Sequence, residues 1–430
     1  MFRRLICIGF LICNFFYIAA QESKLGQLFD YKRFFELEEY VRDSTTAEWK
    51  NTCDGLMYRA FLDNAFGKLK QSDSLIYKIL EECTEIPDSI RYFLHELIID
   101  NNTKKSDYPK VLETYKLLEG VNSDQITMQK KPAYRNMITL YEPLKTKPPL
   151  EIVKGKDYHY IPLYKNGMGH YILPVSHKNI TENFVFDSGA NMSVITESMA
   201  DSMDIDILDS GFVDVGTSID GTVKAKVAFA DELTLGDLKV RNCAFLVLPD
   251  SVLNFKEVGY KITGIIGYPV MREMGEMIIS KQGVMSVPPM PLYKRKSNLF
   301  MDGLSPILEA KYKNEIIQLL FDTGSTGTQM YASFYAKYDQ DTKRFGDLTT
   351  INIGGAGGST RVTCFSWKDF PLSIADNEIK LPIVHVLISP LGLKRNVSDG
   401  VIGQNMADGY EEMIINFKDM YLTFDKKIDQ

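Results

Sequence analysis

The stretch Phe186-Asp187-Ser188-Gly189-Ala190 recurs later in the same chain as Phe321-Asp322-Thr323-Gly324-Ser325. In both copies a short apolar run, FVF and then LLF, leads directly into an Asp, a hydroxyl residue and a Gly. An apolar run that ends at a lone carboxylate predicts a buried strand that delivers the acid to a turn. The glycine lets the backbone bend tightly, so that its N–H can approach the carboxylate oxygens.

The two turns lie inside longer segments that match each other. ILPVSHKNITENFVF spans residues 172–186, ILEAKYKNEIIQLLF spans residues 307–321, and each segment ends directly before its Asp. Downstream of each Asp lies an apolar-apolar-Gly segment, Ile265-Ile266-Gly267 in the first copy and Val401-Ile402-Gly403 in the second. The distance along the chain from the Asp to the glycine is nearly the same in both copies. Ten positions beyond each of these glycines, the chain carries MIIS and then MIIN. The chain therefore contains a duplication whose period is far longer than that of a solenoid repeat, which predicts two separate lobes.

At these residues the chain resembles the retropepsin-like and pepsin-like aspartic peptidases. Each lobe of that family has an apolar-apolar-Asp-Thr/Ser-Gly turn and, later, an apolar-apolar-Gly segment that crosses behind it. Both copies here carry both elements, and the resemblance covers roughly residues 155–428. It implies two pseudo-symmetric β lobes, at residues 155–290 and 297–430, in which short apolar runs broken by polar pairs form antiparallel strands.

The chemistry of such a site requires a pair of acids. Without a metal ion or a covalent nucleophile, amide hydrolysis needs a base that activates water and an acid that protonates the scissile carbonyl. Two carboxylates about 3 Å apart supply both, because like charges so close cannot both ionise easily. The pair then titrates as a unit with two apparent pKa values. Asp187 and Asp322, one from each lobe, are the predicted catalytic pair.

The resemblance also implies roles for the residues around the two acids. Ser188 and Thr323 are expected to form hydrogen bonds across the lobes and to hold both turns rigid. The glycines that follow them present N–H groups to the carboxylates, and the apolar segments form a floor behind the turns. These supporting positions are Gly189, Gly324, Ile266, Gly267, Ile402 and Gly403.

A glycine-bearing hairpin is predicted between the Asp and the Ile-Gly segment of each copy. The two stretches are VGTSIDG at residues 215–221 and IGGAGGS at residues 353–359. Their places suit the flaps that close over a peptide in this family, although neither offers the Tyr of pepsin-like flaps. IGGAGGS lacks the Lys and the following helix that a phosphate-binding loop needs. The candidate flap glycines are Gly216, Gly221, Gly354 and Gly357.

Residues 1–20, MFRRLICIGFLICNFFYIAA, have the composition of a secretory signal peptide, with Arg3 and Arg4 before an apolar core and Ala19-Ala20 at the end. The apolar run is short for a membrane span. The sequence therefore predicts a secreted or periplasmic protein with no membrane span after cleavage. Removing the two arginines changes the formal charge from −7 to −9, because two positive charges leave. An acidic surface argues against a nucleic-acid partner.

Residues 21–147 show apolar residues at three- and four-residue steps, which predicts helices. A weak sequence repeat with a period of 34 residues aligns Ser72-Asp73 with Ser106-Asp107 (106 − 72). Each Ser-Asp pair is expected to begin the second helix of a helical hairpin. The period resembles tetratricopeptide helical hairpins, and an unrelated helical bundle is the alternative. Hairpins of that kind usually bind protein segments, so this domain is a candidate site for a protein partner.

Four cysteines remain after signal cleavage, namely Cys53, Cys83, Cys243 and Cys364, and none has metal-ligand spacing. A bridge between Cys53 and Cys83 would join neighbouring helices in an oxidising compartment, while buried free thiols are the simpler interpretation.

The sequence lacks a HExxH motif and a Gly-x-Ser-x-Gly elbow, so it indicates neither a metal site nor a serine nucleophile, and no cofactor is expected. We expect a multidomain α plus all-β protein, in which a helical-hairpin domain precedes two pseudo-symmetric aspartic-protease β lobes. The predicted function is that of a secreted aspartic endopeptidase acting on peptide or protein substrates. The alternative is a catalytically inactive peptide-binding or scaffold protein with helical repeats.

Overall fold

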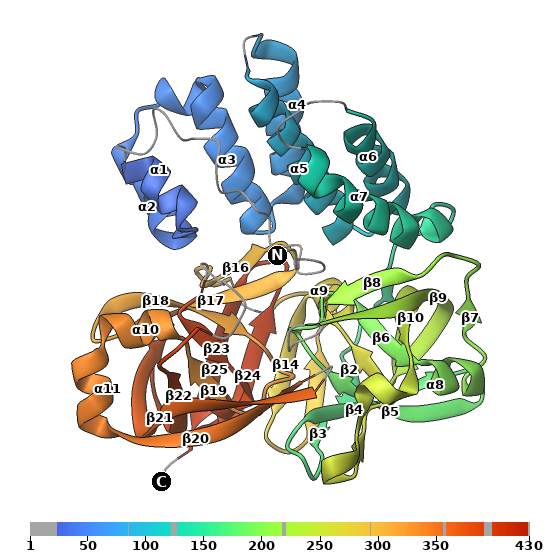
Figure 1. Cartoon of the computed structure of the whole chain (residues 1–430), viewed down its shortest axis with the longest axis vertical. Coiled ribbons are helices and arrows are strands. Elements are labelled where there is room, and N and C mark those ends of the chain that lie inside the picture. The colour runs from blue at the N-terminus through green and yellow to red at the C-terminus, as the bar shows by residue number, and fades with distance from the viewer. Residues whose placement is uncertain are drawn as a thin grey trace. The chain divides into compact units, whose positions relative to one another are not determined.

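The computed structural model of the chain describes residues 24–84, 86–121, 127–216, 221–292, 294–355, 358–390 and 398–428. The predicted signal peptide at residues 1–20 and the candidate flap glycine Gly357 lie outside the described residues. Helices occupy the N-terminal region and β-sheets dominate the rest of the chain (Figure 1), which confirms the α plus β organisation expected from the sequence.

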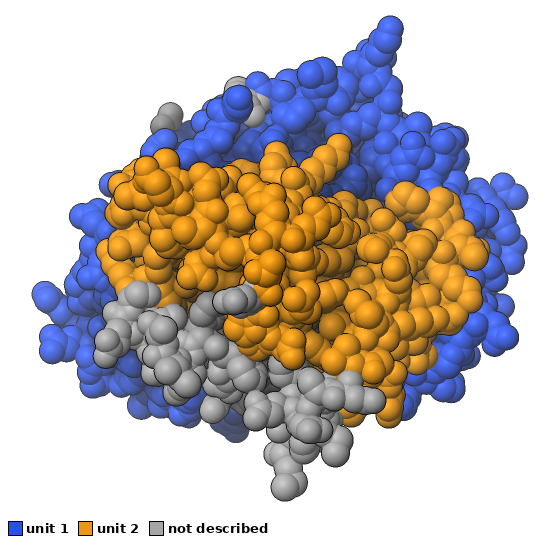
Figure 2. Space-filling model, turned by 90° about the horizontal axis from the view of Figure 1, so that it is seen from above, with its two compact units in different colours: residues 1–7, 150–299, 304–430 blue, residues 8–149, 300–303 orange. Residues whose placement is uncertain are grey.

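Contacts within the chain define two compact units (Figure 2). The helical unit comprises the described residues up to Pro149 together with Phe300–Gly303, and the β unit comprises Leu150–Leu299 and the residues from Leu304 onward. Within the helical unit, Phe300 is fully buried, and its ring lies edge-on at 5.0 Å from that of Phe34 and 5.2 Å from that of Phe35. Asp302 of the same short segment accepts a hydrogen bond from Lys32 at 2.5 Å. Four residues from far along the chain thus complete the core of the helical unit.

The helical unit consists of consecutive helices, and each of α3 to α6 packs against the helix that follows it. The spacing of apolar residues predicted these helices correctly, since Leu56, Ala60 and Phe61 on α3 are all buried. The helices are α1 (Lys24–Asp30), α2 (Phe34–Ser44), α3 (Cys53–Ala65), α4 (Leu69–Glu82), α5 (Asp88–Lys104), α6 (Tyr108–Gly120) and α7 (Thr127–Tyr141), with the 3-10 turns η1 (Trp49–Asn51) and η2 (Glu142–Leu144).

The two Ser-Asp pairs of the 34-residue sequence repeat have different roles in the structure. Asp107 caps α6 as predicted, because its side chain accepts a hydrogen bond from the N–H of Lys110 at 3.2 Å. The expectation was wrong for Ser72 and Asp73, which lie inside α4. Their side chains instead accept hydrogen bonds of 2.9 and 2.8 Å from the amide of Asn101. A buried amide needs such partners, and that requirement arises from packing between helices, which a local sequence pattern does not reveal.

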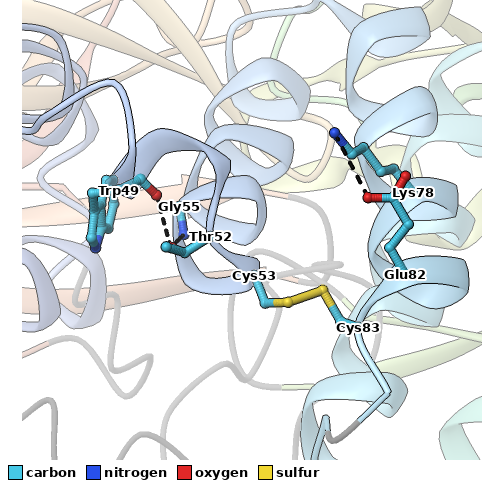
Figure 3. The surroundings of a disulfide bond; sticks show 7 residues. All are labelled: Trp49, Thr52, Cys53, Gly55, Lys78, Glu82 and Cys83. Carbon is cyan, nitrogen blue, oxygen red and sulfur yellow. Dashed lines mark hydrogen bonds and ion pairs between the residues drawn. A yellow bond between two sulfur atoms is a disulfide. The ribbon is translucent and has the colours of Figure 1, made fainter.

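A disulfide joins Cys53, the first residue of α3, to Cys83, which directly follows α4 (Figure 3). Thr52 caps the start of α3 by accepting a hydrogen bond from the N–H of Gly55 at 3.2 Å. The bridge interpretation is therefore correct for this pair, and the buried free-thiol interpretation holds for Cys243 and Cys364.

The β unit contains two large sheets. The first holds β1 (Glu151–Val153), β3 (Tyr164–Lys165), β4 (Tyr171–His177), β5 (Ile180–Phe186), β6 (Ser193–Thr196), β7 (Asp206–Ile207), β8 (Val213–Gly216), β9 (Thr222–Leu235), β10 (Leu238–Leu248) and β13 (Gly264–Ile266). The second runs through β17 (Ser305–Tyr312), β18 (Glu315–Phe321), β23 (Gly400–Ile402), β19 (Thr328–Met330), β22 (Asn377–Leu387), β21 (Gly358–Ile374) and β20 (Gly346–Gly355). The strand β16 (Leu299–Asp302) begins in the β unit and ends in the helical unit.

Smaller elements complete the β unit. They are the strand pair β11 (Asn254–Phe255) and β12 (Tyr260–Lys261), the helices α8 (Glu197–Ser202), α9 (Tyr268–Met274), α10 (Ala332–Lys337) and α11 (Asp339–Phe345), and the 3-10 turns η3 (Asp250–Leu253), η4 (Lys256–Val258) and η5 (Gln404–Ala407).

A five-stranded sheet brings the two sequence copies together. Its order is β2 (His159–Pro162), β15 (Val284–Val287), β14 (Glu276–Ser280), β24 (Tyr410–Asn416) and β25 (Tyr421–Lys427). The matching MIIS and MIIN segments pair with each other in antiparallel register, with Ile278 opposite Ile414. Backbone hydrogen bonds between the copies therefore fix the distance between the two halves of the β unit.

We predict that the disulfide stabilises the helical unit mainly by restricting its unfolded chain. The bridge closes a loop with a sequence separation of 30, so replacing both Cys53 and Cys83 by Ala should cost about 3–4 kcal/mol of unfolding free energy. Urea unfolding followed by far-UV circular dichroism measures this loss. A reductant should lower the midpoint of the wild type and of a Cys364→Ala control, and leave the double variant unchanged. A reductant effect that persists in the double variant would contradict the assignment.

Candidate active site

The two Asp residues of the repeated turn follow two buried strands, as the sequence predicts. Asp187 comes directly after β5, and its N–H donates to the carbonyl of Ile266 at 3.0 Å. Asp322 comes directly after β18, and its N–H donates to the carbonyl of Ile402, also at 3.0 Å. In each case the strand that carries the acid runs parallel to the strand of the Ile-Gly segment, β13 or β23. The backbone thus holds both acids by equivalent bonds.

Reciprocal hydrogen bonds join the two turns. The N–H of Ser188 donates to Oγ1 of Thr323, and the N–H of Thr323 donates to Oγ of Ser188, both at 2.9 Å. The Ser188 hydroxyl donates in turn to the carbonyl of Phe321 at 3.0 Å, and the Thr323 hydroxyl to that of Phe186 at 2.9 Å. Both hydroxyl residues are fully buried, and each hydroxyl donates once and accepts once within this set of bonds. The arrangement leaves neither turn free to shift without breaking several buried hydrogen bonds.

The glycines of the two turns bring each carboxyl group close to the opposite turn. Gly189 donates its N–H to Oδ1 of Asp187 and Gly324 donates to Oδ1 of Asp322, both at 2.8 Å. A Cβ on Gly189 would lie 2.8 Å from Cγ of Asp322, and a Cβ on Gly324 would lie 2.5 Å from Cγ of Asp187. Neither glycine adopts a left-handed φ. Glycine is therefore required by the approach of the opposite carboxyl, whereas the sequence suggested a need for tight bending.

The environment of the two acids favours a shared proton. Burial raises the pKa of Asp187 well above its usual value, and the charge of the neighbouring Asp322 and a hydrogen bond to its carboxyl raise it further. The N–H groups of Gly189 and Ala190 oppose this shift, since they stabilise the ionised carboxylate. Burial and the second acid outweigh them, so Asp187 keeps a proton at a pH where an exposed Asp would lose it.

The predicted floor residues lie behind the turns. Ile266 and Ile402 are fully buried. A Cβ on Gly267 would lie 2.6 Å from the carbonyl oxygen of Ala190, and one on Gly403 would collide with the carbonyl oxygens of Ser325 and Gly327. The backbone at these two glycines therefore packs directly against the turns that carry the acids.

The described flap candidates lie at hairpins. Gly216 ends β8 and pairs with Thr222 at the start of β9, and Gly221 immediately precedes that strand. Gly354 pairs with Ser359 across the hairpin of β20 and β21. The described residues beside each predicted hairpin thus lie in or next to antiparallel strand pairs.

One residue of the site was missed by the sequence analysis. Gln404 is fully buried, its Nε2 donates to the carbonyl of Thr323 at 2.6 Å, and its N–H donates to the carbonyl of Ser325 at 2.9 Å. Tyr268 occupies the matching place after Gly267, and its N–H bonds the carbonyl of Ala190 at 2.9 Å. A polar residue directly after an apolar-apolar-Gly segment was the available signal.

One comparison with known protein families found a match for part of the chain. Residues 173–270 match the family model described as aspartyl protease, a range that contains the turn of Asp187 and the Ile266-Gly267 segment. The match supports an aspartyl protease family for this domain, and hence a protease that acts on peptides or proteins. No curated protein matches the chain.

Two absences hold for the described part of the chain. Among those residues, no three His, Cys, Asp or Glu side chains gather as they would around a metal ion. None of the helices described is both long and apolar enough to cross a membrane.

We predict that Asp187→Asn stabilises the fold at neutral pH. The folded state raises the pKa of Asp187, so folding retains a proton that the unfolded chain releases near pH 4. Wild-type stability should therefore fall as the pH rises from about 4 through the folded pKa of Asp187, whereas the neutral Asn escapes this loss. Urea unfolding at several pH values measures the difference between variant and wild type.

The gain from Asp187→Asn should be small below about pH 4 and grow above it. Asp206→Asn is the matched control, because the exposed Asp206 is solvated in the folded and unfolded states alike. A gain from Asp187→Asn that does not change with pH would contradict the shared-proton environment.

Proposed function

We propose that the chain is an aspartic endopeptidase whose catalytic pair is Asp187 and Asp322. The observation that carries the proposal is the set of reciprocal bonds between Ser188 and Thr323, which holds each acid against the glycine of the other turn. In this proposal the two sequence copies, at residues 155–290 and 297–430, are pseudo-symmetric lobes that contribute one acid each. The aspartyl protease match over residues 173–270 supports it for the first copy.

The proposed mechanism uses one water molecule and the proton shared by the two acids. The raised pKa of Asp187 supports a pair that carries a single proton at the working pH. One acid of the pair removes a proton from the water as the water attacks the scissile carbonyl. The other acid donates its proton to the carbonyl oxygen. The tetrahedral intermediate then collapses with transfer of a proton to the leaving amine. The N–H groups of Gly189 and Gly324 orient the carboxylates throughout.

We propose that the substrate lies extended between the two lobes. The hairpins of β8 and β9 and of β20 and β21 are the flaps of this proposal, with Gly216, Gly221 and Gly354 near the ends of their strands. An extended peptide can pair with hairpin edges as an added strand, which gives affinity from the backbone and specificity from the side chains.

We further propose that the protein is exported, to the periplasm or out of the cell. The composition of residues 1–20 supports this, and so does the disulfide between Cys53 and Cys83, because disulfides persist mainly in oxidising compartments.

The activity test compares wild type with Asp187→Asn and Asp322→Asn on denatured casein between about pH 3 and pH 7. Each substitution should reduce the rate by about 10²–10⁴-fold, because it removes an acid–base group from the pair. Wild-type activity should decline as the pH rises through the pKa of Asp187, since the shared proton is then lost. Asp206→Asn is the control for a carboxylate lost elsewhere. Equal rates in all four proteins would exclude the peptidase and favour a peptide-binding protein without catalysis.

The helical unit has a surface suited to a protein partner. A hollow of about 460 Å³ lies among α4, α5 and α6, and its lining includes Tyr77 and Leu117, which are 45% and 53% exposed. Exposed apolar side chains around a hollow are typical of surfaces that bind peptide segments. We propose that this unit, with its tetratricopeptide-like hairpins, docks protein substrates for the peptidase.

The docking proposal predicts that substitutions in the hollow affect the cleavage of large protein substrates but not that of short peptides. Replacing both Tyr77 and Leu117 by Ser should leave cleavage of short peptides unchanged. It should raise the KM for large proteins about tenfold, because both side chains lose part of their apolar contact with the substrate. Tyr31→Ser, a change at an exposed position outside the hollow, is the control. Unchanged protein cleavage in the double variant would exclude docking here, and faster peptide cleavage would indicate that the unit inhibits.

A further inference from the structure

A short turn between β3 and β4 carries His170, a residue with no role in the site described so far. Asn166 closes this turn, because its side-chain oxygen accepts hydrogen bonds from the N–H groups of Met168 and His170, both at 3.0 Å. The backbone N–H of Asn166 also donates to the carbonyl of His170 at 3.0 Å. Gly169 has a φ of +85°, which only glycine adopts without strain. The backbone on both sides of His170 is thus fixed by local bonds.

The imidazole ring of His170 is also fixed in orientation. It stacks on Tyr260 of β12, with ring centroids 5.4 Å apart and an interplanar angle of 9°. Asn166 donates from Nδ2 to the Tyr260 hydroxyl at 2.9 Å, so the same residue holds the turn and the ring beneath His170. A ring held this way presents its nitrogen atoms in fixed directions.

The turn lies beside the segment that follows the second acid. A Cβ on Gly169 would lie 3.3 Å from Cγ2 of Thr326, a residue two positions after Gly324. The charge of Asp322 acts on the imidazole of His170. His170 belongs to the first sequence copy, yet it stands next to the catalytic turn of the second.

Burial decides which nitrogen of His170 carries the proton. Nδ1 is buried and has no hydrogen-bond partner among the described residues. A buried N–H without a partner is destabilising, which favours the neutral ring with its proton on Nε2. Charging the ring would place a second proton on the buried Nδ1. Accordingly, burial lowers the pKa of His170, and the charge of Asp322 only partly opposes that shift.

We propose that His170 is a substrate-binding residue that donates its Nε2–H to a side-chain oxygen of a peptide bound beside Asp322. The substrates favoured would carry Gln, Asn, Glu or Asp at one position near the scissile bond. This inference rests on the proposed peptidase function. It goes beyond that function because it names a residue outside the acid pair and the class of side chain that the residue selects.

The test uses pairs of peptides that differ only by Gln or Met at one position, scanned along a short extended sequence. Gln and Met have similar length, and only Gln offers a side-chain oxygen. Binding to the full-length Asp187→Asn protein is measured by fluorescence anisotropy, and cleavage is measured with the wild type. We expect one position where Gln is preferred to Met by about tenfold, through KM more than kcat, as for one hydrogen bond.

Two substitutions at residue 170 separate the hydrogen bond from the packing. His170→Phe keeps an aromatic ring on Tyr260 but removes the donor, and it should abolish the preference for Gln. His170→Asn keeps an N–H donor and should restore part of it. His385→Phe is the matched control, because His385 is also a half-buried imidazole with an unpartnered, buried Nδ1, and it lies on β22. It should leave the preference intact.

The outcomes distinguish this inference from the proposed function. Cleavage with the same Gln-to-Met ratio in wild type and His170→Phe would overturn the role of His170 and leave the peptidase in place. Absence of cleavage, with a binding preference that His170→Phe abolishes, would overturn the peptidase and retain His170 as a recognition residue. Absence of any position that prefers Gln, in binding and in cleavage, would overturn the inference.

Discussion

Hydrogen bonds between the turn of Ser188 and the turn of Thr323 are the interaction on which the β unit depends. Each hydroxyl is buried, and its partners all belong to the other turn, so neither can be satisfied alone. A buried hydroxyl or N–H without a partner costs about 1–3 kcal/mol. Moving one turn away from the other inside the protein would leave several such groups unpaired, so it would incur this cost more than once. The same bonds hold the two carboxyl groups together, and burial, followed by the charge of the neighbouring Asp322, raises the pKa of Asp187. Rigidity and acid chemistry thus have one physical origin.

This arrangement costs stability, and other parts of the β unit offset the cost. Two carboxyl groups held close together disfavour folding wherever both would ionise. The five-stranded sheet opposes this, because β14 and β24 pair along their length with Ile278 opposite Ile414 and join the two copies by ordinary backbone bonds. Fully buried Ile266 and Ile402 add apolar contact behind the turns. The two turns therefore pack against a sheet and apolar residues whose contribution to stability does not depend on the ionisation of the acids.

The sequence predicted those parts of the site that depend on short local sequence patterns. Each Asp-Ser/Thr-Gly turn follows an apolar strand, and the nearly equal spacing to the Ile-Gly segments indicated that these segments lie behind the turns. In the structure the segments form β13 and β23, which pair in parallel with β5 and β18. Features that depend on distant contacts could not be predicted in this way. Gln404 bonds the carbonyl of Thr323, far back in the sequence, and Phe300 completes the core of helices that lie near the start of the chain. The need for glycine at Gly189 was predicted, but for a different reason, since its true cause is the carboxyl of the opposite turn.

The two sequence copies hold their acids by the same backbone bonds but surround them with different side chains. After Gly403, Gln404 donates a hydrogen bond to the carbonyl of Thr323, whereas Tyr268, in the matching place, packs its ring edge-on against Phe417 at 5.3 Å. The turn that carries His170 likewise lies against Thr326, close to the turn of Asp322. Acid–base chemistry requires two groups with unlike proton affinities, and different surroundings are the physical means of separating them. The two turns thus share one backbone geometry, and the different side chains around them supply the unlike surroundings that the proposed acid–base pair needs.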